Sequence, residues 1–131
     1  MEPSSDRQTE DLVLDLAHFL DETGARDIVA LDVSEQSSFA RYFIIGGAVS
    51  AGQLRGLKRR AHERLGELGL RARQSPKRDD ESGWLLIDCD DLIVHLMLDE
   101  QRQFYELEKL WFDARILYRS EEENAGASAE T

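Results

Sequence analysis

Two short apolar segments, residues 84–89 and 92–98, are separated by only Asp90 and Asp91. A two-residue connection between strand-forming segments predicts a β-hairpin, and it fixes which residues lie opposite each other. The expected pairs are Cys89 with Leu92, Ile87 with Val94, and Leu85 with Leu96. Because side chains alternate along a strand, these six residues share one wholly apolar face, which we expect to form part of the core.

The opposite face of this hairpin has a mixed character. It carries Trp84, Leu86, Asp88, Ile93, His95 and Met97. Aromatic and methionine side chains are enriched at binding surfaces, so we interpret this face as the docking surface for a partner. A second layer of helices over this face is the alternative, since sheets in α/β proteins are often covered on both sides.

The histidines and the cysteine give no sign of a metal site. A lone histidine between apolar neighbours, such as His95, is more often a hydrogen-bonded structural residue than a ligand or a base. His18 and His62 have no second ligand at metal spacing. The single cysteine, Cys89, excludes an internal disulfide and a four-cysteine zinc site. We therefore expect no bound metal.

Helical and strand patterns alternate along the rest of the chain. Apolar residues recur at helical spacing over 12–20, with Thr9 as a candidate cap and Gly24 as the stop. A second helix is expected from the capping-box pattern at 50–53 to Gly69. Further strands are expected at 27–33, 42–45 and 70–74, and a last helix at 100–110. This alternation, with one strand–helix–strand crossover, predicts an α/β fold with a mixed sheet.

The length of 131 residues suits one domain. We expect a disordered tail at 1–8, a folded domain at 9–119 and a disordered acidic tail at 120–131. No apolar run approaches the roughly 18–20 residues that span a bilayer, and the acidic N-terminus does not resemble a signal peptide. Together with the single cysteine, these features predict a cytoplasmic protein with no membrane partner.

The charge of the chain is strongly segregated. A net charge of −11 argues against a dedicated DNA-binding module, which needs clustered cations to neutralise phosphate. Residues 55–78 nevertheless hold nine of the 16 Lys and Arg and only two acids. This segment favours a peripheral contact with RNA, or an RNA-binding module centred on it. A solvated helix face beside acidic tails is the alternative.

An enzymatic interpretation also starts from the hairpin. Asp88 and Asp90 are two residues apart, a spacing that can hold a divalent metal for phosphoryl or nucleotidyl transfer. Gly46 and Gly47, ahead of the second helix, are candidates for a loop that grips phosphate. Both motifs are short and unspecific, and Asp at the end of a hairpin is common turn chemistry.

Four segments carry a more specific pattern. They are residues 27–33 (Asp-Ile-Val-Ala-Leu-Asp-Val), 38–45 (Ser-Phe-Ala-Arg-Tyr-Phe-Ile-Ile), 84–95 (Trp-x-Leu-x-Asp-x-x-Asp-x-x-Val-His) and 102–111 (Arg-x-Phe-Tyr-x-Leu-Glu-x-Leu-Trp). In this order they resemble the motifs of the bacterial ribosomal silencing factors, the RsfS or Iojap family, and the match runs over residues 12–117. The chain departs from the family at Arg41, where Asp is usual, at Gly47-Ala48, which replaces Thr-Gly, and at Asp90, which replaces a hairpin Gly.

The resemblance implies both a fold and a function. The expected fold is a mixed five-stranded sheet flanked by helices, with the shape of a nucleotidyltransferase but without its catalytic site. The implied partner is the large ribosomal subunit, bound through its fourteenth ribosomal protein. A bound factor would block joining of the small subunit and repress translation during nutrient limitation or stationary phase. This steric mechanism requires no enzyme activity and no cofactor. A metal-dependent nucleotidyltransferase that uses Asp88 and Asp90 is the alternative.

We expect the contacts with the partner to come from the hairpin and the last helix. The candidate residues are Trp84, Asp88, Asp91, His95, Tyr105 and Glu108. For Tyr105, and for its neighbours Leu107 and Trp111, packing in the core is an equal alternative. Phe112 and Leu117 suit a small homodimer interface or the core equally well.

Overall fold

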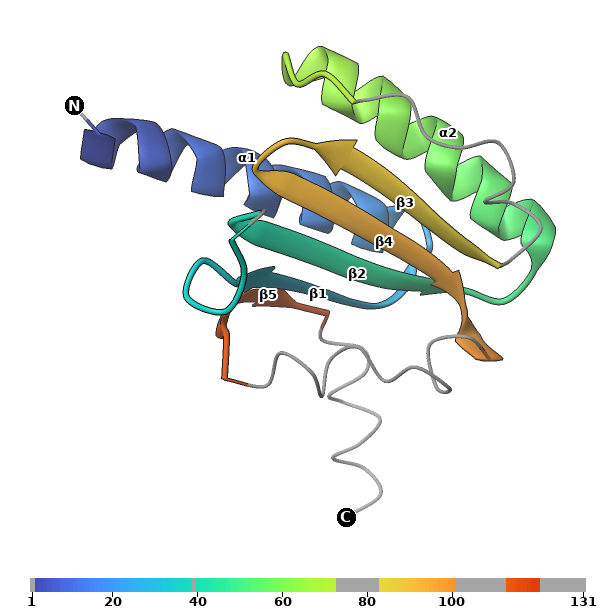
Figure 1. The fold of residues 1–131 in the computed structure, drawn as a ribbon. Helices are drawn as coiled ribbons and strands as arrows, with labels where there is room; N and C mark the ends of the chain where they lie inside the picture. The colour runs from blue at the N-terminus through green and yellow to red at the C-terminus, as the bar shows by residue number, and fades with distance from the viewer. Residues whose placement is uncertain (1, 39, 73–82, 101–112, 121–131) are drawn as a thin grey trace.

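A single five-stranded sheet carries two helices on one of its faces (Figure 1). The computed structural model describes residues 2–38, 40–72, 83–100 and 113–120. The elements are α1 (Glu2–Glu22), β1 (Arg26–Asp32), β2 (Tyr42–Ala48), α2 (Ala51–Glu67), β3 (Trp84–Cys89), β4 (Leu92–Leu98) and β5 (Arg115–Arg119). The strand order is β3-β4-β2-β1-β5, and β2 pairs with β4 in parallel while the other neighbours are antiparallel. The predicted α/β class with a mixed five-stranded sheet is confirmed.

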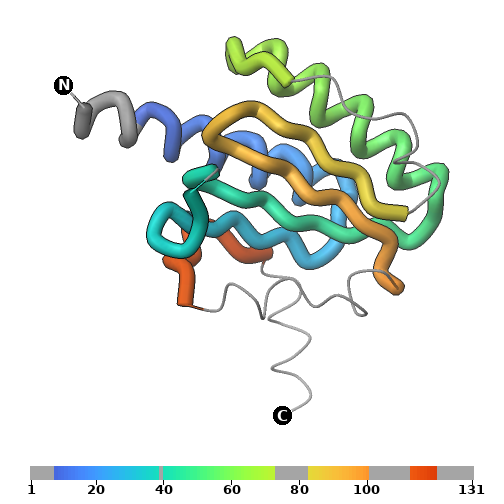
Figure 2. Tube along the Cα trace, in the orientation of Figure 1, coloured from blue at the N-terminus to red at the C-terminus, as the bar shows by residue number. Residues whose placement is uncertain are grey.

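The two helices divide the covered face between them. α1 packs mainly on β1, β2 and β5, and α2 packs on β2 and β4 (Figure 2). The amphipathic spacing explains this arrangement, because α1 contributes Val13, Leu16 and Leu20 to the core. From α2 the buried residues are Leu54, Leu57, Ala61 and Leu65. The six apolar residues of the hairpin lie in the same cluster.

A second buried cluster lies on the opposite face of the sheet. Its strand residues are Val29, Leu31, Phe43, Ile45 and Met97. Trp84 and Ile93 are partly buried and pack against it. The alternating pattern of β1 and β4 explains why both faces are apolar, since successive side chains point to opposite sides. The mixed face of the hairpin therefore continues into an apolar cluster in the middle of the sheet.

The hairpin has the predicted register. Cys89 pairs with Leu92, Ile87 with Val94, and Leu85 with Leu96. The predicted strand at 70–74 is wrong for its described part, because residues 70–72 form no strand. The fifth strand is β5 at the other end of the sheet, and it pairs with β1.

The ends of the helices correct one prediction and confirm another. α1 begins at Glu2, so Thr9 lies inside the helix and is not its cap, and residues 2–8 are helical where we expected a disordered tail. Ser50 is the predicted cap of α2, and its Oγ accepts a hydrogen bond from the Gln53 N–H. The Gln53 side chain accepts from the Val49 N–H. In the predicted capping box it would accept from the Ser50 N–H, so the observed hydrogen bond is shifted by one residue.

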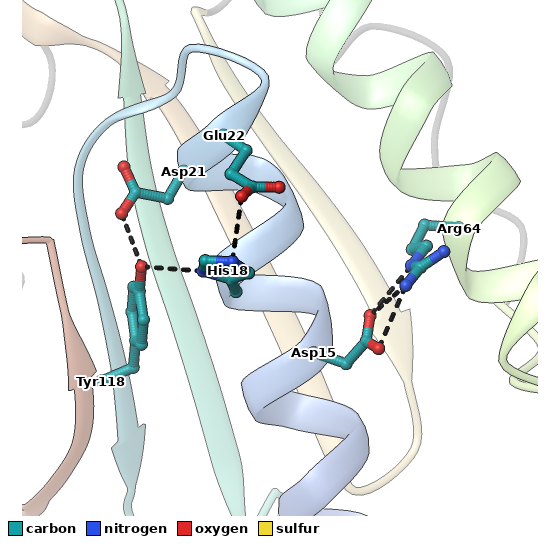
Figure 3. Close-up of polar contacts among 6 residues, drawn as sticks. All are labelled: Asp15, His18, Asp21, Glu22, Arg64 and Tyr118. Carbon is teal, nitrogen blue, oxygen red and sulfur yellow. Dashed lines mark hydrogen bonds and ion pairs between the residues drawn. The ribbon is translucent and has the colours of Figure 1, made fainter.

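Polar contacts join the helices to each other and to the edge strand β5 (Figure 3). Arg64 of α2 donates two hydrogen bonds to the Asp15 carboxylate of α1, at 2.9 and 3.1 Å. The Tyr118 hydroxyl of β5 donates to Asp21 of α1 at 2.6 Å. These contacts hold three elements in place that are far apart in the sequence.

Some predictions fall on residues that the structure does not describe. The last helix is described only at residues 99 and 100, which are helical. Residues 121–131 of the expected tail lie outside the described residues, as does Phe112. Leu117 is described, and it packs against the first core cluster. No helix in the described part of the chain is both long enough and apolar enough to cross a membrane.

Candidate docking surface

The edge strand β3 presents the mixed face that the sequence singled out. β3 stands at one end of the strand order, and among the described strands its only neighbour is β4. Along it, Trp84 and Asp88 are partly buried and Leu86 is 37% exposed. An edge strand with an aromatic, an aliphatic and an acidic side chain in a row offers both apolar area and charge to a partner.

Trp84 rests on a buried aromatic pair. Its Nε1 donates a hydrogen bond to Nδ1 of His95 at 3.3 Å, and the two rings are 6.0 Å apart between centroids. Phe43 also contacts the imidazole edge to face, with 4.8 Å between the ring centroids. β2 and β4 are parallel neighbours in which Ile45 pairs with His95. Phe43 lies two residues before Ile45 on β2, so its ring is within reach of His95. The indole is therefore held by the sheet.

His95 is 7% exposed, and burial lowers its pKa to about 4. It is therefore neutral at physiological pH. Because Nδ1 accepts from Trp84, the neutral ring carries its proton on Nε2. This atom is buried and has no hydrogen-bond partner among the described residues. His95 thus orients Trp84 and is not itself an exposed contact residue.

The hairpin turn and the end of β3 carry three aspartates, Asp88, Asp90 and Asp91. Oδ1 of Asp88 accepts a hydrogen bond from the Asp90 N–H at 3.0 Å, and Asp90 has a φ of 70°. The backbone carbonyl of Asp91 accepts from the N–H groups of Arg41 and Tyr42, both at 2.9 Å. Burial, followed by the charges of Asp88 and Asp90, raises the pKa of the Cys89 thiol to about 11. The thiol is therefore protonated and a poor nucleophile.

The hydrogen bond between Asp88 and Asp90 accounts for the two-residue spacing of aspartates that suggested a metal-dependent enzyme. Asp88 caps the backbone of the turn, which is the ordinary use of Asp at this place. Within the described ranges, no three His, Cys, Asp or Glu residues are grouped so as to hold a metal ion. The expected phosphate loop is wrong, because Gly46 and Gly47 lie inside β2 and pair with β4. Their backbone groups serve the sheet and are not free to bind phosphate.

The structure places four of the six candidate residues on one hairpin, where Trp84 contacts His95 and the aspartates lie toward the turn. Trp84, Asp88, Asp91 and His95 all lie on the hairpin, while Tyr105 and Glu108 lie outside the described residues. Sequence reasoning missed Phe43, which supports His95 from a strand 52 positions away in the chain. No sequence signal fixed that contact, because it depends on the parallel register of β2 and β4.

Comparison with known proteins gives a consistent result. The RsfS family model, described as ribosomal silencing factor during starvation, matches residues 6–131. The ribosomal silencing factor RsfS of Bacillus subtilis is 36% identical over 96 residues, which cover 73% of this chain and 80% of that protein. The mouse mitochondrial assembly of ribosomal large subunit protein 1 is 34% identical over 98 residues, and these cover only 43% of its length.

A solved structure agrees with these matches. The crystal structure of a protein from Chromobacterium violaceum superposes with a TM-score of 0.67 at 29% identity. The superposition covers 77% of this chain and 81% of that chain. The sequence match over nearly the whole chain and the shared fold show that this chain belongs to the family of ribosomal silencing factors, RsfS.

Proposed function

We propose that this chain binds the large ribosomal subunit through its fourteenth ribosomal protein and blocks joining of the small subunit by its bulk. Translation is thereby repressed in the cytoplasm when nutrients are short. Membership of the RsfS family is the observation that carries the proposal. The mechanism uses occupation of a surface and no catalytic group, in keeping with relatives that are named as silencing factors.

The hairpin edge has the chemistry that such docking requires. Trp84 supplies a large side chain in a fixed orientation, and rigid aromatic anchors dominate the binding energy of many interfaces. Asp88, four residues further along β3, and Asp91, in the turn at the far end of the hairpin, supply negative charge within a chain of net charge −11. Ribosomal proteins are usually basic, so this charge raises the rate of encounter and helps to select the orientation. Tyr105 and Glu108 remain part of the proposed surface.

Co-sedimentation of the full chain with purified large subunits tests the proposal. We expect the wild-type protein to pellet with large subunits and to lower the yield of joined ribosomes when small subunits are added. Trp84→Ala should abolish most of the binding, because truncated anchors typically cost about 2 kcal/mol or more, which is roughly 30-fold in affinity.

Ile116→Ala is the matched control. Ile116 is 49% exposed on β5, the edge strand at the opposite end of the sheet. It removes exposed apolar area as Trp84→Ala does, but away from the proposed surface, and it should leave binding unchanged. Wild-type protein that neither pellets nor slows joining contradicts the proposed function. Equal losses for both variants would contradict the location of the surface.

A further inference from the structure

The outer face of α2 carries a group of cations that the docking surface does not use. α2 holds five Lys or Arg and two Glu within a chain of net charge −11. Arg55, Arg59 and Arg60 are exposed, and Lys58 is partly exposed. Leu54, Leu57, Ala61 and Leu65 face the core, so the helical period places Arg59 outward, Arg55 and Lys58 on one flank of the helix and Arg60 on the other. We call Arg55, Lys58, Arg59 and Arg60 the cationic face of α2.

These four cations form no ion pair in the described part of the chain. Other arginines do find partners: Arg64 binds Asp15 and Glu67, and Arg115 binds Glu10 and Asp32. In a chain with 27 acids and 16 Lys and Arg, unpaired cations grouped on one helix are unexpected. Glu63 is the one acid of α2 that is exposed and outside these pairs. Within the described part of the chain, therefore, no acid neutralises the charge of this face.

The pKa of a nearby histidine is affected by the positive charge of this face. His62 lies on α2 one turn after Lys58, and its pKa is lowered by partial burial and by the positive charge of Lys58. His62 is therefore neutral at physiological pH, and the charge of the face comes from the Arg and Lys side chains alone.

The position of α2 places this face in the same half of the molecule as the hairpin. α2 covers the sheet over β2 and β4, and β3 follows β4 as the edge strand. α1 covers the other half, over β1 and β5. Figure 1 shows α2 running along the β3 side of the sheet. Trp84 lies on the opposite face of the sheet from α2, so a partner that meets both Trp84 and the cationic face extends around the β3 edge.

We propose that the cationic face of α2 binds the phosphate backbone of ribosomal RNA next to the protein contact made by the β3 edge. This inference rests on the proposed function, because it takes the large subunit as the partner. Three of the four cations are Arg, whose planar fork of donors matches phosphate oxygens. Contacts of this kind fix orientation and read no sequence. The protein edge then supplies specificity, and the RNA contact supplies salt-dependent affinity.

The salt dependence of large-subunit binding tests the inference. Each phosphate contact contributes about one unit to the slope of log affinity against log salt. We expect Arg59→Gln to lower this slope by about one, and Arg55→Gln/Arg59→Gln by about two. Arg119→Gln is the matched control: it removes one exposed Arg from β5, at the far edge, and should leave the slope unchanged. An unchanged slope in the α2 variants, or an equal fall in Arg119→Gln, overturns the inference.

Photo-crosslinking distinguishes RNA from protein as the occupant. Gly66 is exposed on α2, seven residues after Arg59, and a Cβ there meets no atom within 4 Å. A photoreactive amino acid in place of Gly66 therefore fits without disturbing the fold. Crosslinks from this position to ribosomal RNA support the inference. Crosslinks only to ribosomal protein, such as an acidic segment of one, overturn it.

The two proposals fail in different ways. If wild-type protein does not pellet with large subunits, the proposed function fails and the inference fails with it. If the protein pellets and Trp84→Ala abolishes binding, while the α2 variants keep the wild-type slope, only the proposed RNA contact is contradicted. Circular dichroism of each variant checks that helix content is retained.

Discussion

Trp84 donates its indole hydrogen bond to His95 across a diagonal of the hairpin. The residue directly opposite His95 is Leu86, and Trp84 itself pairs with Met97. The 3.3 Å bond therefore joins diagonal neighbours, which aromatic side chains are long enough to reach. A partly exposed anchor is thereby tied to a buried ring, and this relationship makes His95 a positioning residue.

His95→Phe should weaken binding to large subunits by about threefold to tenfold. The substitution keeps an aromatic ring beside Phe43 but removes the acceptor, and a neutral hydrogen bond contributes about 0.5–1.5 kcal/mol. Trp84→Phe removes the donor of the same bond. Because both changes break one interaction, the double variant should be about as weak as Trp84→Phe alone. Titration of labelled protein with large subunits measures this, and additive losses would show that the bond does not orient Trp84.

The folding stability of the chain should fall as the pH drops through the range between the unfolded and folded pKa values of His95. Its pKa is about 4 in the folded chain, below the ordinary value of 6.5, so the unfolded chain binds the proton more readily. Stability is therefore full above pH 6.5 and falls as the pH drops toward 4. We expect a loss of about 2 kcal/mol between pH 7 and pH 5 from this group. Urea denaturation at both pH values measures the loss.

His95→Phe removes this titration, so the variant should lose less stability than wild type over the same window. The difference between the two proteins isolates His95 from carboxylates that also titrate below pH 5. Identical pH dependence in His95→Phe and in the wild type would refute the assignment.

The hairpin was predictable because its information is local. Two residues, Asp90 and Asp91, set the register, and alternation then assigned each side chain to a face. β5 was not predictable in the same way. Its five residues, Arg-Ile-Leu-Tyr-Arg, are partly polar, and β5 pairs with β1 more than 80 positions earlier in the chain. Such a strand is fixed by its neighbour and by contacts to α1, which a local pattern does not contain.

The candidate surface was predictable only in part, for a related reason. Alternation placed His95 on the mixed face with Trp84, as found. It did not predict that His95 would be buried, because this depends on Phe43 and Ile45 in the adjoining parallel strand. The glycines of β2 misled the interpretation for the opposite reason. Gly46 and Gly47 resemble a loop in the sequence, but a buried strand also uses Gly where another side chain approaches closely.

Tyr118→Phe should destabilise the chain by about 1–3 kcal/mol. The hydroxyl of Tyr118 donates to the Asp21 carboxylate at 2.6 Å in a partly buried position, and a bond to a charged acceptor is stronger than a neutral one (Figure 3). The bond ties the edge strand β5 to α1, so amide hydrogens of β5 should exchange faster in the variant. Hydrogen exchange and urea denaturation measure the two effects. Exchange in the hairpin, which is at the other edge, provides the internal control.

Gly46→Ala should destabilise the chain by about 1–3 kcal/mol, because it overfills the core between β1 and β2. A Cβ at Gly46 would lie 2.7 Å from Cδ1 of Ile28, which is fully buried. Ile28→Val removes that Cδ1, and alone it should cost about 0.5–1.5 kcal/mol for the lost burial. The double variant Gly46→Ala/Ile28→Val should therefore be more stable than the sum of the single losses predicts, since one change relieves the clash that the other creates.

Gly66→Ala is the control for the intrinsic effect of replacing glycine. Gly66 lies on the exposed face of α2, and a Cβ at this position would meet no atom within 4 Å. Helix propensity alone should therefore raise stability by about 0.5–1 kcal/mol. Urea denaturation of the four variants and the wild type measures all of these differences. If the losses at Gly46 and Ile28 simply add, close approach of Ile28 is not the reason that β2 carries glycine at this position.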